Sequence, residues 1–153
     1  MGLLTFKGGI HPFDGKELSK EQPIEVYLPK GTMAYPLSQH IGAPAKPVVK
    51  KGDRVLKGQV IAEAGGFVSA PIHASVSGTV KGMEPRLTAT GTMANAIIVE
   101  NDQQYEEVEY QPVTSLGELT KEEILKRIQE GGVVGMGGAG FPTHVKLAPK
   151  NPE

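Results

Sequence analysis

Residues 44–80 read PAKPVVKKGDRVLKGQVIAEAGGFVSAPIHASVSGTV, and this stretch decides the fold. Short runs rich in β-branched residues lie at 47–49, 59–62 and 78–80. Turn-forming pairs such as Gly52-Asp53 and Ser77-Gly78 separate these runs, and no helical periodicity passes through them. Strands of about four or five residues are stable only when they close on one another, so we predict a small closed β module.

The order of these turns resembles that of the biotinyl and lipoyl carrier domains, which fold as a barrel-sandwich hybrid. Carriers of that family present a lysine at a hairpin tip, where a prosthetic group is attached. The corresponding tip in this chain, residues 62–70, reads AEAGGFVSA and contains no lysine. A biotin or lipoate carrier therefore stays an alternative that requires a modified lysine near this tip, because a fold alone does not establish an activity.

The composition excludes several classes of protein. The chain has 153 residues, with 16 lysines and arginines against 17 acids and a formal net charge of −1. This balance provides no long-range field for a phosphate backbone, so we expect no nucleic-acid partner. The absence of cysteine excludes disulfides, thiolate nucleophiles and iron–sulfur ligands within these residues. No apolar run approaches the roughly 20 residues that span a bilayer, so we expect a soluble chain.

Further β structure is expected on both sides of this stretch. Residues 23–29 read PIEVYLP and alternate in polarity, which predicts a strand. Pro36 keeps residues 33–44 out of a central strand, so we expect an edge strand or a connector there. The remaining expectations are a loop of small residues at 86–93, a final strand at 96–100, and a strand or extended linker at 103–112.

One strong helix is predicted, from Thr120 to Glu130. Thr120 and Glu123 have the spacing of a capping box, in which each side chain bonds to the backbone of the other residue. Acidic residues fill the first turn, and Gly131 is the expected stop at the C-terminal end. An apolar stripe for packing is formed by Ile124, Leu125 and Ile128.

The histidines do not form a metal-binding pattern. A metal site requires two or more histidines or carboxylates at a fixed spacing, and His11, His40, His73 and His144 share none. We expect no metal site, and we interpret His40 as an ordinary hydrogen-bonded histidine.

A second informative stretch, residues 133–147, reads VVGMGGAGFPTHVKL. Its glycines leave backbone N–H groups open to the close approach of a phosphate or a flat cofactor. Gly135, Gly137 and Gly140 satisfy the pattern G-x-G-x-x-G, but the given sequence ends before the position, about 20 residues later, where an acidic ribose partner would stand. From spacing alone, nucleotide binding and a flexible glycine linker both stay open.

The longer string GMGGAGFPTHVK, at 135–146, resembles the nucleotide loop of the flavoprotein subunit of respiratory complex I, which binds FMN and NADH. Two further strings are FKGGIHP at 6–12 and PLSQHIGAP at 36–44. Together with the lysine-free barrel, they make the chain similar to the RnfC family, a subunit family of the Rnf electron-transport complex. The resemblance covers nearly the whole chain.

The resemblance implies a parent protein that takes electrons from NADH through FMN and passes them by two 4Fe-4S clusters towards membrane subunits. It implies coupling to sodium or proton transport and to ferredoxin reduction. It further implies a peripheral position on the cytoplasmic face of the membrane, with the other Rnf subunits and ferredoxin as partners and no direct membrane insertion. Because this chain has no cysteine and ends soon after the glycine loop, we expect a piece from the N-terminus of a longer protein. Such a piece is expected to be an inactive structural or docking module.

The resemblance also implies site residues. Gly135, Gly137 and Lys146 correspond to the side of the loop that contacts the FMN phosphate. Gly138, Ala139 and Phe141 correspond to the NADH side, with Gly140 between them in the same loop and Phe141 as a stacking partner for a ring. Complex I carries an arginine where this chain has Met136.

These expectations divide the chain into four parts. The parts are an N-terminal arm with edge strands at 1–43, a barrel-sandwich core at 44–102, a linker at 103–119, and a helix and glycine loop at 120–153 that begin an α/β domain for FMN and NADH. Besides the carrier, two alternatives stay open: the corresponding subunit of a sodium-pumping NADH:quinone reductase, and a cobalamin reductase. Paired cysteine clusters further along the gene would favour Rnf or the cobalamin reductase, and their absence would favour the quinone reductase.

Overall fold

The computed structural model describes residues 12–113 and 115–148 of the chain. Most of the expectation for residues 6–12 lies outside the described part. The elements are β1 (Thr32–Pro36), β2 (Lys46–Pro47), β3 (Arg54–Val55), β4 (Val60–Glu63), β5 (Ile72–His73), β6 (Gly78–Leu87), β7 (Met93–Asn101), a short 3₁₀ turn (Leu116–Glu118), α1 (Lys121–Glu130) and α2 (Thr143–Lys146).

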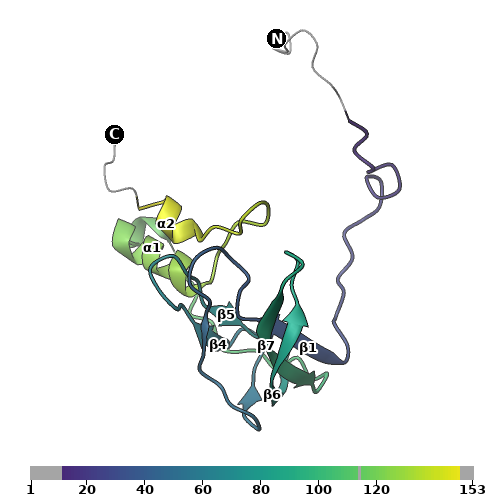
Figure 1. Cartoon of the computed structure of the whole chain (residues 1–153). Coiled ribbons are helices and arrows are strands. Elements are labelled where there is room, and N and C mark those ends of the chain that lie inside the picture. Colours follow the sequence, from purple (N-terminus) through teal and green to yellow (C-terminus); the bar gives the residue numbers. More distant parts are fainter. Residues whose placement is uncertain (1–11, 114, 149–153) are drawn as a thin grey trace.

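The strands form two antiparallel sheets (Figure 1). The larger sheet has the order β1-β7-β6-β3, and the smaller sheet has the order β2-β4-β5. β1 is an edge strand that pairs with β7 from Thr32 opposite Glu100 to Pro36 opposite Ala96. The expectation of an edge strand or connector around Pro36 is therefore confirmed, since proline cannot donate to a second neighbour.

The core lies between the two sheets and is built from small and β-branched side chains. Ile61 from β4 is buried with Val55, Val76 and Val80, and β7 adds Ile97 and Val99. Burial of each such side chain stabilises the fold by about 1.5–3 kcal/mol. The strands of two to five residues, too short to be stable alone, thus close with the longer β6 and β7 on a shared core, and the predicted barrel-sandwich hybrid is confirmed.

The strand predicted at residues 23–29 is wrong. These residues form no strand, and the side chains of Ile24, Val26 and Tyr27 are 100%, 90% and 80% exposed. The polarity pattern is that of a strand, but β1 already occupies the edge of the sheet beside β7. Figure 1 shows the segment running away from the barrel. Its last part is tied down because the carbonyl of Pro29 accepts hydrogen bonds from Asn101 Nδ2 and the Tyr105 hydroxyl, at 2.6 and 2.8 Å.

The loop predicted at residues 86–93 is shorter in the structure. β6 continues to Leu87 and β7 begins at Met93, so only Thr88–Thr92 connect the two strands. The ten residues of β6 and the nine of β7 pair along both strands, and their outer ends, 85–87 and 93–95, extend beyond the core as a projecting hairpin. Local composition did not reveal this extension, because the two strands satisfy each other's backbone groups without burying apolar side chains.

The helix prediction is confirmed in detail. The Thr120 hydroxyl accepts a 3.2 Å hydrogen bond from the N–H of Glu123, and the Glu123 carboxylate accepts a 2.7 Å bond from the N–H of Thr120. α1 ends at Glu130 and is capped by Gly131. The short helix α2 was not predicted. Residues 103–112 form no strand beyond one isolated bridge between Lys57 and Glu107, and Gln103 and Tyr105 depart from extended backbone with φ values of +59° and +53°. Within residues 12–113 and 115–148, neither helix has the length and apolar character to cross a bilayer.

Candidate functional site

The glycine-rich stretch forms a closed loop between α1 and α2. The N–H of Gly135 donates to the carbonyl of Phe141, and the N–H of Thr143 donates to the carbonyl of Val133, both at 3.0 Å. Val134 and Pro142 pair as an isolated antiparallel bridge. The two ends of the loop are thus held together, and residues 136–140 form its tip.

This tip packs on the barrel. The N–H of Ile41 donates a 3.0 Å hydrogen bond to the carbonyl of Ala139. Gly140 adopts a φ of +60°, and a Cβ at this position would lie 3.0 Å from the carbonyl oxygen of Gln39 and 3.3 Å from the Cα of His40. A side chain at position 140 would therefore push the loop off the segment 39–41, so this glycine is required by packing within the chain.

A groove of about 610 Å³ lies between the loop, the segment 36–41 and the tip of the β6–β7 hairpin. Its lining is Pro36, Ser38, Gln39, His40, Ile41, Leu87, Thr88, Ala89, Thr90, Gly135, Met136, Gly138, Ala139 and Gly140. Among the described residues, no lysine, arginine, aspartate or glutamate takes part in this lining. The groove therefore joins the predicted nucleotide loop to two parts of the barrel.

The predicted site residues lie on different sides of the loop. Those that line the groove are Gly135, Gly138, Ala139 and Gly140, and those that do not are Gly137, Phe141 and Lys146. The Nζ atom of Lys146 lies 5.7 Å from the centre of the Phe141 ring, within the range of a cation–π interaction. Their contacts with FMN and NADH stay predictions.

The glycines of the loop differ in whether backbone conformation or packing requires a residue without a Cβ. Gly138 has a φ of +60°, which disfavours any other residue. Gly135 and Gly137 do not have positive φ values, and a Cβ on Gly137 would meet nothing within 4 Å. A Cβ on Gly135 would make only ordinary contacts of 3.6 Å or more. The described part of the chain thus gives no steric reason for Gly135 and Gly137, which fits an approach by a group from outside it.

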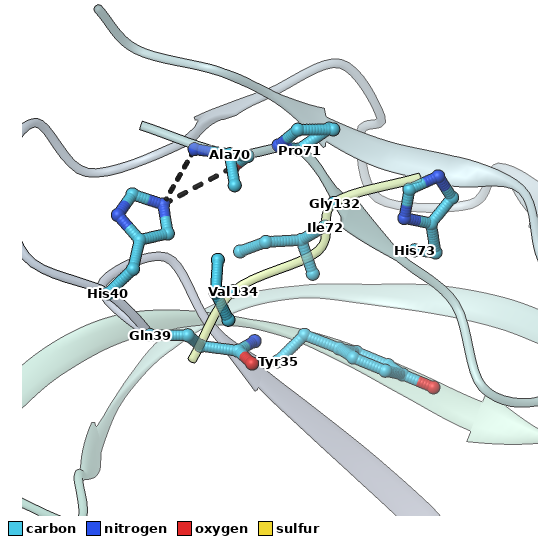
Figure 2. Close-up of a pocket in the computed structure, with 9 residues that line it drawn as sticks. All are labelled: Tyr35, Gln39, His40, Ala70, Pro71, Ile72, His73, Gly132 and Val134. Carbon is cyan, nitrogen blue, oxygen red and sulfur yellow. Dashed lines mark hydrogen bonds between the residues drawn. The ribbon is translucent and has the colours of Figure 1, made fainter. Parts of the chain in front are cut away.

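A smaller pocket of about 160 Å³ separates the loop from the barrel wall (Figure 2). On one side of it, the N–H of Ala70 donates to His40 Nε2 at 3.0 Å. Since Nε2 must accept this bond, the ring proton is on Nδ1, which donates to the carbonyl of Ile41 at 3.0 Å. His40 is therefore a structural histidine, as interpreted from the sequence, and it fixes the segment that carries the glycine loop.

His73 lies on the opposite side of this pocket, next to Gly132 (Figure 2). A Cβ on Gly132, whose φ is +65°, would lie 2.6 Å from the carbonyl of Pro71 and 3.2 Å from His73 Nδ1. Burial lowers the pKa of His73, and a hydrogen bond to the backbone carbonyl of Glu130 acts in the opposite direction with a smaller effect. The C-terminal end of α1 thus rests on β5 of the barrel.

The turn that presents lysine in carrier domains is tied to the barrel here. The Ser69 hydroxyl donates to the carbonyl of Ala43 and accepts from the N–H of Gly65, both at 2.8 Å. A Cβ on Gly65 would collide with the carbonyl of Pro44. The turn therefore lies against residues 43–44 and carries no amine for attachment.

The structure also adds features that the sequence did not predict. His144 in α2 is 9% exposed, and its Nδ1 atom has no hydrogen-bond partner within the described part of the chain. Among residues 12–113 and 115–148, no group of three histidine, cysteine, aspartate or glutamate side chains could hold a metal ion. Sequence analysis missed Thr88 and Thr90 as groove residues, because their only signal was a run of small hydroxyl residues in a loop.

Comparisons with known proteins place the chain in a family. The family described as the RnfC barrel sandwich hybrid domain matches residues 4–104. The C subunit of the proton-translocating ferredoxin:NAD(+) oxidoreductase complex of Clostridium ljungdahlii is 47% identical over 148 residues, which cover 96% of this chain and 32% of that protein.

Two further relatives give the same result. The C subunit of the Na(+)-translocating ferredoxin:NAD(+) oxidoreductase complex of Acetobacterium woodii is 45% identical over 94% of this chain and 33% of its own length. The C subunit of the ion-translocating oxidoreductase complex of Vibrio cholerae is 44% identical over 95% of this chain and 19% of its own length. The chain thus spans a third or less of these relatives. The family match over residues 4–104 and these identities over nearly the whole chain show that the chain belongs to the RnfC family.

Proposed function

We propose that this chain forms the N-terminal part of the RnfC subunit in an ion-translocating ferredoxin:NAD oxidoreductase, where it positions a loop for FMN and NADH. The barrel acts as the structural module, and the loop at 133–147 provides backbone contacts to the cofactors. The subunit is peripheral and lies at the cytoplasmic face of the membrane, with other subunits of the complex and ferredoxin as partners. The FMN and the two 4Fe-4S clusters belong to the whole protein.

The observation that carries this proposal is that nothing in the described residues requires glycine at positions 135 and 137. Neither glycine is required by backbone conformation or by packing within the described residues, whereas Gly140 is required by both. Glycine loses more conformational entropy on folding than any other residue. Two glycines that neither packing nor backbone conformation requires therefore indicate a different role at the start of the loop. The close approach of a phosphate to their backbone N–H groups supplies one.

Lys146 supports the same interpretation from the other side of the loop. Its side chain is exposed, its ammonium group lies over Phe141, and it does not line the neutral groove. A cation beside backbone N–H groups is a favourable environment for a phosphate. Following the family resemblance, we assign the FMN phosphate to Gly135, Gly137 and Lys146, and the NADH to Gly138, Ala139 and Phe141.

The docking of the loop explains the role of the barrel. Ile41, Gln39 and His40 hold the tip of the loop from one side, and His73 supports the end of α1. A barrel that carries no attachment lysine but fixes a cofactor loop is a scaffold and not a carrier. In this proposal the chain's residues bind and orient the cofactors, and the cofactors carry out the electron transfer.

The test uses the full-length subunit. FMN content and the dissociation constant for NADH are measured in the wild type and in Gly137→Ala, with Gly117→Ala as a control. Gly117 also lacks a positive φ, and its Cβ would make only an ordinary 3.6 Å contact, but it lies in the 3₁₀ turn outside the loop. We expect Gly137→Ala to lower FMN content or weaken NADH binding by about tenfold, which corresponds to about 1.4 kcal/mol.

Two outcomes would contradict the proposal. One is a wild-type subunit that binds neither FMN nor NADH. The other is a Gly137→Ala variant with unchanged affinity for both cofactors. Intact-mass analysis of the purified subunit provides an independent check, because a biotin or lipoate adduct on a lysine would instead support the carrier alternative.

A further inference from the structure

The groove between the barrel and the glycine loop is neutral. Its polar side chains are those of Ser38, Gln39, His40, Thr88 and Thr90, and none of the described lysines, arginines, aspartates or glutamates lines it. Both nitrogens of His40 are used within the chain, by Ala70 and by the carbonyl of Ile41. A diphosphate carries negative charges that would find no cation here, whereas an uncharged group with hydroxyls and amides would be matched.

The wall contributed by the hairpin is built to accept hydrogen bonds. The Thr88 hydroxyl donates to the carbonyl of Thr92 at 2.9 Å. The hydroxyls of Thr88, Thr90 and Thr92 also lie 2.9–3.2 Å from one another. Thr88 gives its one proton to the Thr92 carbonyl, and the protons of Thr90 and Thr92 can serve only two of the three contacts between the hydroxyls. With these protons turned into the turn, Thr90 keeps at least one free lone pair, which can accept from a ligand donor such as a ribose hydroxyl or a carboxamide N–H group.

The opposite wall offers complementary groups. The side chains of Ser38 and Gln39 are exposed and make no hydrogen bond to other described residues, so their donors and acceptors are available. Apolar side chains stand at the margin, with Met136 fully exposed, Leu87 at 69% and Ile41 at 47%. Flexible thioether and aliphatic groups suit contact with the face of a planar ring.

The groove is continuous with one side of the glycine loop. The carbonyl of Ala139 faces the barrel, and Gly138 and Ala139 both line the groove. These are residues that the proposed function assigns to the NADH side of the loop. Of the residues assigned to the phosphate side, Gly137 and Lys146 lie outside the lining and Gly135 lines the groove where the loop begins. Phe141, on the NADH side, does not line it. The groove therefore runs from the start of the loop along Gly138 and Ala139 towards the hairpin.

We infer that this groove binds an uncharged nucleoside portion of the dinucleotide, and that Thr88 and Thr90 of the barrel hairpin contact its hydroxyl or amide donors. The inference rests on the proposed function and extends it, because it gives the barrel a direct part in dinucleotide binding. The diphosphate then lies outside the groove, next to the glycine loop.

The experiment uses the full-length subunit. The dissociation constant for NADH and the content of bound FMN are measured for the wild type, a Thr88→Ala/Thr90→Ala double variant and Ala89→Trp. Thr79→Ala is the matched control, since Thr79 is an exposed threonine of the same hairpin, in β6 and far from the tip. We expect the double variant to weaken NADH binding by about fivefold or more, as the loss of neutral hydrogen bonds would.

Ala89→Trp tests the same groove without removing a hydroxyl. Ala89 is exposed and lines the groove, so the indole fills space without disturbing the core. We expect NADH to bind at least about tenfold more weakly to this variant, with FMN content and melting temperature unchanged. Thr79→Ala is expected to behave as the wild type in every measurement.

The outcomes separate this inference from the proposed function. If the wild type binds FMN and NADH but both groove variants keep NADH affinity within about twofold, the inference is wrong and the proposed function stands. If Thr90→Lys strengthens NADH binding about fivefold or more, the groove holds the diphosphate, and the inference is also overturned. If the wild type binds neither cofactor, both proposals are wrong.

Discussion

The backbone N–H of Ile41 donates a 3.0 Å hydrogen bond to the carbonyl of Ala139, and this bond links the barrel to the glycine loop. It fixes the loop at its tip, where Gly140 also touches the backbone of Gln39 and His40. The contact makes the loop a part of the barrel's surface. The stability of the barrel and the position of the loop are therefore coupled.

Substitution of Gly140 should separate packing from cofactor binding. Gly140→Ala introduces a Cβ 3.0 Å from the Gln39 carbonyl at a φ of +60°, and we expect a loss of stability of about 1–3 kcal/mol. Gly137→Ala is the matched control, because its Cβ meets nothing within 4 Å, and it should change stability by less than about 0.5 kcal/mol. Denaturant unfolding of both variants measures the difference, and equal stabilities would contradict the packing role of Gly140.

His40 should be important for stability and not for chemistry. In His40→Ala the N–H of Ala70, a residue that is 1% exposed, loses its acceptor, and the carbonyl of Ile41 loses a donor. A buried unsatisfied N–H costs about 1–3 kcal/mol, so we expect a destabilisation of that size. Thermal unfolding monitored by circular dichroism measures it. A variant as stable as the wild type would show that water replaces the ring at no cost.

Asp102 should make the fold sensitive to acid. The Ser77 hydroxyl, the N–H of Gln104 and the Arg54 guanidinium, in this order of effect, hold the pKa of Asp102 below its ordinary value of 3.8. Because the folded state has the lower pKa, this stabilisation is present above an unfolded pKa of 3.8 and is lost as the pH falls through the folded pKa. We expect Asp102→Asn to lose less stability than the wild type as the pH falls below 3.8. Acid unfolding of both proteins measures this, and an equal loss of stability in the two would contradict the prediction.

His73 acts in a higher pH range. Burial lowers its pKa in the folded state below the ordinary value of 6.5. As the pH falls below 6.5, the unfolded chain takes up a proton that the folded chain does not, so stability decreases until the folded pKa is reached. We expect His73→Gln to remove this part of the pH dependence. The measurement is the midpoint of urea unfolding from about pH 7.5 to about pH 5. If this midpoint changes with pH equally in His73→Gln and the wild type, the burial of His73 is not the cause of the pH dependence.

The 153-residue chain on its own should bind FMN and NADH weakly or not at all. Gly137 and Lys146, which are assigned to the phosphate, are both exposed, so a phosphate bound there would stay largely in contact with water. The chain also spans a third or less of its relatives, so most of a dinucleotide site would have to be ordered by the ligand itself. Titration calorimetry measures the affinity. A micromolar dissociation constant would show that this part alone forms the site.

The sequence by itself determined the local features of this protein. The turns of the barrel have their own glycines, α1 has its capping box and glycine stop, and the turn at 62–70 lacks lysine. Such features depend on backbone preferences and on hydrogen bonds between residues a few positions apart, which a local pattern encodes. The glycine loop was interpreted through its resemblance to the nucleotide loop of the complex I flavoprotein subunit, because its spacing alone left a flexible linker open.

The tertiary structure alone decided which segments meet. Residues 23–29 have the polarity of a strand, but the edge beside β7 is taken by β1, and no local pattern reports that competition. The hairpin extends to Leu87 because its strands pair with each other, and its threonines then face the distant glycine loop across the groove. Contacts between distant segments depend on how the whole core closes, so the groove and its neutral lining could be found only in the folded molecule.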